Sequence, residues 1–62
     1  MKTREIESLL TRNGFKIIRA NKHTLWSNGH MTVCVPRHKE VSRGIAKQII
    51  KQLATLPNPV LQ

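Results

Sequence analysis

The chain has 62 residues and a formal net charge of +8, with 11 Lys and Arg against 3 acidic residues. This length fits one domain at most, and such a short chain buries only about 60% of its unfolded surface. A single cysteine, Cys34, excludes an internal disulfide and the paired-cysteine spacing of a zinc site. Without an apolar export sequence or a segment of roughly 18 apolar residues, we expect a cytoplasmic protein that does not bind membranes. The positive charge favours a polyanionic partner such as nucleic acid.

Residues 3–13 carry the pattern of a short amphipathic helix. Thr3 can cap its first turn, and Asn13-Gly14 predicts a left-handed stop after its last turn. The apolar side chains that share one helical face are Ile6, Leu9 and Leu10.

Residues 15–20 are rich in β-branched and aromatic side chains, and they predict the first strand. Alternation places Phe15 and Ile17 on one side of this strand and Lys16 and Ile18 on the other. A turn at residues 21–22 leads into the next strand.

Residues 23–27 and 30–35 flank Asn28-Gly29, which is typical of a two-residue type I′ hairpin turn. That turn fixes a register in which Trp26 faces Met31 and His23 faces Cys34. The side chains predicted to face the helices are Thr24, Trp26, Met31, Val33 and Val35. The side chains predicted to lie on the open face or its rim are His23, Leu25, Ser27, His30, Thr32 and Cys34.

Pro36 ends the ladder because it has no N–H to donate. Ser42 is a good N-cap for a second helix, which the apolar spacing predicts up to Leu53. The last residues, 57–62, contain two prolines and are expected to be irregular or docked on the surface, outside a single domain of residues 1–56. The order is α-β-β-β-α, which predicts an α+β fold. Its three-stranded antiparallel sheet has both helices on one face, as in double-stranded-RNA-binding domains.

A basic row on the second helix consists of Arg43, Lys47 and Lys51, spaced four residues apart. Such rows are usually solvated helix faces. The shortage of acidic residues to neutralise this row favours contacts with phosphates. The inward position of Trp26 argues against a platform on which bases stack.

The three histidines, His23, His30 and His38, raise the question of RNA cleavage. The 2′-OH of RNA attacks its own phosphate when one group removes its proton and another protonates the leaving oxygen. A histidine can do either, and Lys or Arg can stabilise the charged phosphorane. His23, next to Lys22 on the polar face, is the best candidate, although a packing or hydrogen-bonding role is the common one for such a residue. The histidine spacing fits no common zinc site, and we expect no metal and no cofactor.

From Ile6 to Leu53 the chain resembles the HicA (YcfA-like) toxin family of toxin–antitoxin systems. The features that carry the resemblance are Gly14-Phe15, Arg19, His23, Gly29, the strand TVCVP, His38, and the helix RGIAKQIIKQLA with Gly44, Ile49 and Gln52. The resemblance implies a metal-independent endoribonuclease that cleaves mRNA and is inhibited by a HicB-type antitoxin. It also implies that His23 is the catalytic histidine, although the Gly-Ser pair that precedes it in the family is Asn21-Lys22 here.

We therefore predict an mRNA-cleaving toxin with His23 as general acid or base. The predicted RNA contacts are Lys22, Arg37, His38, Lys47 and Lys51. The free toxin is expected to be a monomer that forms a hetero-oligomer with its antitoxin. Two alternatives remain: a non-catalytic module that binds double-stranded RNA by shape, and an interaction protein whose basic surface meets an acidic partner.

Overall fold

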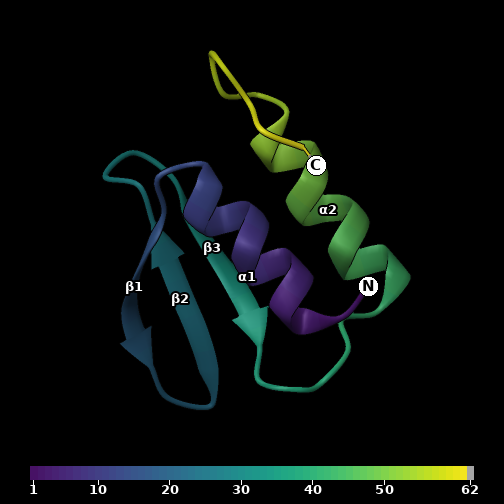
Figure 1. The fold of residues 1–62 in the computed structure, drawn as a ribbon. Helices are drawn as coiled ribbons and strands as arrows, with labels where there is room; N and C mark the ends of the chain where they lie inside the picture. Colours follow the sequence, from purple (N-terminus) through teal and green to yellow (C-terminus); the bar gives the residue numbers. More distant parts are fainter. Residues whose placement is uncertain (62) are drawn as a thin grey trace.

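The computed structural model describes residues 1–61 and has the predicted order of elements (Figure 1). The elements are α1 (Thr3–Arg12), β1 (Lys16–Ala20), β2 (His23–Ser27), β3 (Thr32–Pro36) and α2 (Arg43–Leu53). The strands form one antiparallel sheet in the order β1-β2-β3. The predicted α+β class and the α-β-β-β-α order are therefore confirmed.

One face of the sheet packs against the helices in a single core. On β2 and β3 the side chains buried on this face are Thr24, Trp26, Val33 and Val35. The helices add Ile6, Leu9 and Leu10 from α1 and Ala46, Ile49 and Leu53 from α2. The indole Nε1 of Trp26 is buried without a hydrogen-bond partner in the described chain. The prediction that Trp26 points inward is confirmed, so its ring cannot serve as an exposed stacking platform.

The start of α1 differs from the prediction. Lys2, not Thr3, occupies the N-cap position and makes no side-chain cap. Thr3 is the first helical residue, and its hydroxyl donates to the carbonyl oxygen of His38. The hydroxyl therefore ties α1 to the loop after β3 instead of capping the helix. At the other end Gly14 adopts φ +83°, as the predicted left-handed stop requires.

The predicted type I′ turn at Asn28-Gly29 is wrong. Such a turn needs a positive φ at both central residues, and here only Gly29 has one, at +95°. The Asn28 side-chain oxygen instead accepts the backbone N–H groups of His30 (2.9 Å) and Met31 (2.7 Å). This local bonding competes with the ladder and opens a loop over residues 28–31.

The longer loop shifts the hairpin register by two residues. Trp26 pairs with Val33, not Met31, and His23 pairs with Pro36, not Cys34. Because side chains alternate with a period of two, a shift of two leaves every paired side chain on its predicted face. His30 and Met31 leave the ladder. Met31 still packs on the core from the loop.

Strand β1 contains an irregularity that the sequence did not reveal. Ile17 pairs with Trp26 and Arg19 pairs with Leu25, so Ile18 bulges out between them without a partner. Ile17 and Ile18 are 52% and 60% exposed, because β1 contributes no residue to the buried core. Phe15, just before the strand, is buried in the core as predicted.

The side chain of Ser42 caps α2 as predicted, accepting the N–H of Ile45 at 3.4 Å. Ile45 itself is 37% exposed and lies outside the core. After α2, the tail docks on Asn13, whose side-chain amide exchanges two 2.8 Å hydrogen bonds with the backbone of Val60. Gln62, the last residue of the predicted tail, lies outside the described residues.

Candidate functional site

An open hollow of about 550 Å³ lies on the uncovered face of the sheet, at the end where β2 begins. The residues that line it are Arg19, Asn21, Lys22, His23, Leu25 and Cys34. The structure thus places His23 and Lys22, two of the predicted site residues, in one cavity. The His23 side chain is exposed, so a ligand on this face can reach its ring.

Two hydrogen bonds hold the turn that leads into His23, one from the backbone and one from a side chain. The N–H of Asn21 donates to the carbonyl oxygen of His23 at 3.1 Å. The carbonyl oxygen of Asn21 accepts a 2.9 Å hydrogen bond from Nη1 of Arg37. Arg37, predicted as a phosphate contact, therefore also fixes the turn at residues 21–22. A guanidinium has five N–H donors, so this bond leaves others for a phosphate.

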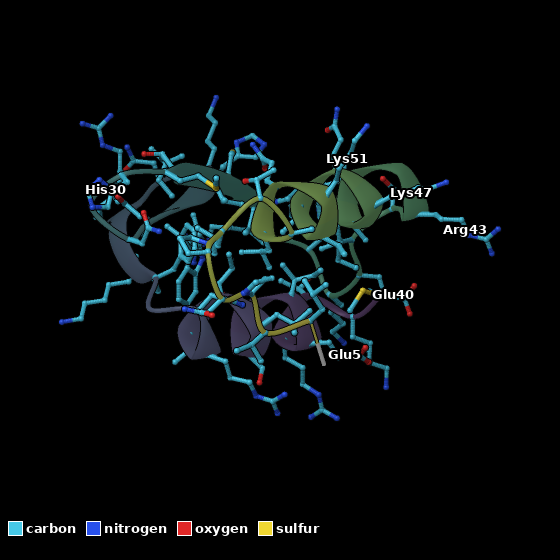
Figure 2. All side chains as sticks on the ribbon, turned by 90° about the horizontal axis from the view of Figure 1, so that it is seen from above. Glu5, His30, Glu40, Arg43, Lys47 and Lys51 are labelled. Atoms are coloured by element: carbon cyan, nitrogen blue, oxygen red, sulfur yellow. The ribbon has the colours of Figure 1, made fainter. Side chains whose placement is uncertain are left out.

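The charges of the hollow are positive only. Arg19 and Lys22 belong to its lining, which contains no acidic side chain. The chain's three acidic residues are Glu5, Glu7 and Glu40. Glu5 and Glu7 belong to α1 and Glu40 to the segment between β3 and α2, and Figure 2 shows Glu5 and Glu40 away from the sheet. A phosphate in the hollow would therefore meet cations without competing carboxylates.

The basic row of α2 is exposed along its length, at Arg43, Lys47 and Lys51. Figure 2 shows that Lys47 and Lys51 point away from α1. The uncovered face of the sheet also points away from α1, because α1 packs against the opposite face (Figure 1). The predicted lysines of α2 and the His23 hollow therefore lie on the same side of the molecule.

The other two histidines lie elsewhere. His38 lines a different cavity, next to Thr3 and Arg4 of α1. His30 lies in the hairpin loop, far from the basic row in Figure 2. Neither belongs to the lining of the His23 hollow. A contact between His38 and RNA stays a prediction.

Arg19 is the charged residue of the hollow that the sequence-based site did not include. Strict alternation along the strand assigns it to the same side as Ile17, toward α1. The bulge at Ile18 changes that side, and no residue pattern in the strand KIIRA marks a bulge. The family resemblance includes Arg19, but only the pairing of β1 with β2 shows that it lies on the open face.

Within residues 1–61, no three His, Cys, Asp or Glu side chains are grouped so that they could hold a metal ion. Over the same range, no helix has both the length and the apolar character needed to cross a membrane.

Together these features define a small basic α+β protein whose open sheet face carries an accessible histidine beside two cations. The family model of the HicA toxin of bacterial toxin–antitoxin systems matches residues 3–54. The chain belongs to this family. It is accordingly a toxin, and its class implies an antitoxin partner. No curated protein and no solved structure gives a significant match.

Proposed function

We propose that this toxin is a metal-independent endoribonuclease that cleaves mRNA with His23 as general acid or base. The observation that carries the proposal is the exposed His23 ring in a hollow whose only charged neighbours are cations. Membership of the HicA toxin family supports it.

The chemistry requires little beyond what this surface offers. The RNA 2′-oxygen forms a bond to the adjacent phosphorus, and the bond from phosphorus to the 5′-oxygen breaks. This leaves a 2′,3′-cyclic phosphate and a 5′-hydroxyl. One proton leaves the 2′-OH and one reaches the 5′-oxygen, and a histidine can transfer either. Cations stabilise the charge that develops on the phosphorane.

The proposed RNA contacts extend from the hollow to α2. Lys22 binds phosphate in the hollow, and Lys47 and Lys51 bind the flanking RNA backbone. Arg37, which lines the cavities beside α1 and not the hollow, binds a phosphate there. His38 contributes a supporting contact from its separate cavity. Each of these four basic residues is exposed, so its positive charge is accessible to a phosphate.

A HicB-type antitoxin is the proposed inhibitor, and it would act by covering the hollow. We further propose that residues 1–56 form the functional domain and that the toxin acts in the cytoplasm. The free toxin would be a monomer, and a hetero-oligomer would form with the antitoxin.

The test compares wild type with His23→Ala in bacteria and with purified protein. Wild type should arrest growth and cut a labelled mRNA fragment in the presence of EDTA, and His23→Ala should do neither. Equal growth arrest by both proteins would exclude the catalytic role of His23. Cleavage that stops when EDTA is added would exclude the metal-independent mechanism.

The second candidate is a non-catalytic RNA-binding module. It is favoured by the basic row of α2 on the same side as the open sheet face and by Asn21-Lys22 in place of the family's Gly-Ser pair. A binding module would shift the labelled RNA intact, whereas the toxin cuts it. Little salt-sensitive affinity for RNA would instead favour a protein whose basic surface binds only an acidic protein partner.

A further inference from the structure

We propose that Arg19 binds the scissile phosphate beside His23 and that the bulge at Ile18 exists to deliver it there. This inference rests on the proposed cleavage of RNA and names a further catalytic residue for it. It comes from the register of β1, which decides the face on which Arg19 lies.

The register gives Arg19 two alternative positions. In a regular ladder that pairs Ile17 with Trp26, Arg19 would pair with Thr24. Thr24 is 8% exposed and faces the helices, so a regular strand would direct the Arg19 side chain toward the core. The bulge pairs Arg19 with Leu25 instead. Leu25 lies on the open face, and Arg19 lines the hollow with it.

The bulge leaves Ile18 without a partner residue on β2. The apolar side chain of Ile18 is 60% exposed. Bulges are frequent next to active sites, where they re-aim a side chain. Here the re-aimed side chain is the only arginine in a cavity that also holds an accessible histidine.

Arginine suits this position for a chemical reason. Its planar guanidinium can donate two parallel hydrogen bonds to two phosphate oxygens, whereas the ammonium of Lys22 acts as a point charge. A fork on the non-bridging oxygens would hold the phosphate while His23 transfers a proton. It would also stabilise the additional negative charge of the phosphorane.

Lys16 offers a matched control. It lies on the same strand and, paired with Ser27, on the same open face, but outside the lining of the hollow. Arg19→Ala and Lys16→Ala each remove one exposed cation from β1. A loss of cleavage or of RNA affinity that both variants share reflects the removal of a positive charge from β1. A loss found only in Arg19→Ala reflects the position of Arg19 in the hollow.

Two measurements test the proposal. Single-turnover cleavage of a labelled mRNA fragment is measured in EDTA, and affinity is measured for the same fragment with 2′-O-methyl groups, which cannot attack. Arg19→Ala should slow cleavage by about 100-fold or more, and Lys16→Ala by about threefold or less. Arg19→Lys keeps the charge without the fork and should fall between them. Thermal unfolding checks that each variant folds. If Arg19→Ala does not fold, the comparison of Arg19→Lys with wild type tests the proposal.

The outcomes separate this inference from the proposed function. Arg19→Ala that cleaves and binds like Lys16→Ala overturns the role of Arg19 and leaves the ribonuclease proposal standing. If wild type cuts no RNA, the ribonuclease proposal fails. The affinity for the 2′-O-methyl RNA then tests separately whether Arg19 binds phosphate. A loss of affinity about tenfold greater than that of Lys16→Ala would then keep Arg19 as a phosphate-binding residue. Equal affinities would overturn it.

Discussion

The two ends of the β2–β3 hairpin each carry an exposed histidine, but they are built differently. His23 lies in the ladder opposite Pro36, beside a turn that Arg37 holds. His30 lies in a loop, outside the ladder, and its backbone N–H donates to the Asn28 side-chain oxygen. Only His23 shares a hollow with Arg19 and Lys22. The comparison teaches that the residue type alone does not define a site, whereas fixed backbone and neighbouring cations distinguish one histidine from the other.

The sharpest way to break this comparison is to replace each histidine in turn. His23→Gln should slow RNA cleavage by about 10²–10⁴-fold, because it removes the group that transfers a proton. His30→Gln should leave cleavage unchanged, because His30 lies outside the hollow. Single-turnover assays on both variants measure this difference. A comparable loss from His30→Gln would show that both ends of the hairpin act on the RNA.

Arg37 tests whether the fixed turn at the His23 end matters. Arg37→Ala removes the 2.9 Å hydrogen bond to the carbonyl oxygen of Asn21 and should slow cleavage by about tenfold, as expected for loss of a charged hydrogen bond. Lys39→Ala, in the same segment and with the same loss of charge, is the control. Equal cleavage rates in the two variants would show that Arg37→Ala acts only through its lost charge. Cleavage would then not depend on this hydrogen bond.

The lysines of α2 test whether bound RNA extends beyond the His23 hollow. Replacing Lys47 and Lys51 together with Ala should weaken RNA binding and flatten its dependence on salt. The slope of log K against log salt should fall by about 0.7 for each lost contact with single-stranded RNA. Arg4→Ala with Arg12→Ala removes the same charge from α1 and should change the slope less. Equal slopes for the two double variants would show that RNA does not distinguish these two helices.

The smallest expected effect concerns the His30 end. Asn28→Ala removes the oxygen that accepts two backbone N–H groups, and it should lower the free energy of unfolding by about 1 kcal/mol. Cleavage should be unchanged, because the loop is separate from the hollow. Denaturant unfolding and the cleavage assay check the two parts. A loss of cleavage without a loss of stability would place the loop in the RNA site.

Patterns within a few residues predicted much of the fold. The two helices, the Ser42 cap and the Gly14 stop follow from local spacing and backbone preference. The face of each paired hairpin residue was also correct although the register was wrong, because alternation depends only on whether positions differ by an even number. The same local reasoning selected His23 and Lys22, which do share a cavity.

The errors occurred where a polar side chain bonds to a backbone group other than the one that its position suggests. The sequence suggested a two-residue turn at Asn28-Gly29. Instead, the N–H groups of His30 and Met31 donate to the Asn28 side-chain oxygen, and the loop is longer. The sequence also suggested a cap at Thr3, but the hydroxyl bonds to the carbonyl of His38.

The sequence by itself therefore determined the order of the elements, the two faces of the hairpin and the family to which the chain belongs. The local bonds of the Asn28 side chain accompany the shifted hairpin register. The tertiary structure decided the hold of Arg37 on the turn before His23 and the place of Arg19 in the hollow. The physical reason is the range of the interactions. Helical and strand periodicity act between near neighbours, whereas a bulge and a side-chain clamp depend on which residue of another segment lies opposite.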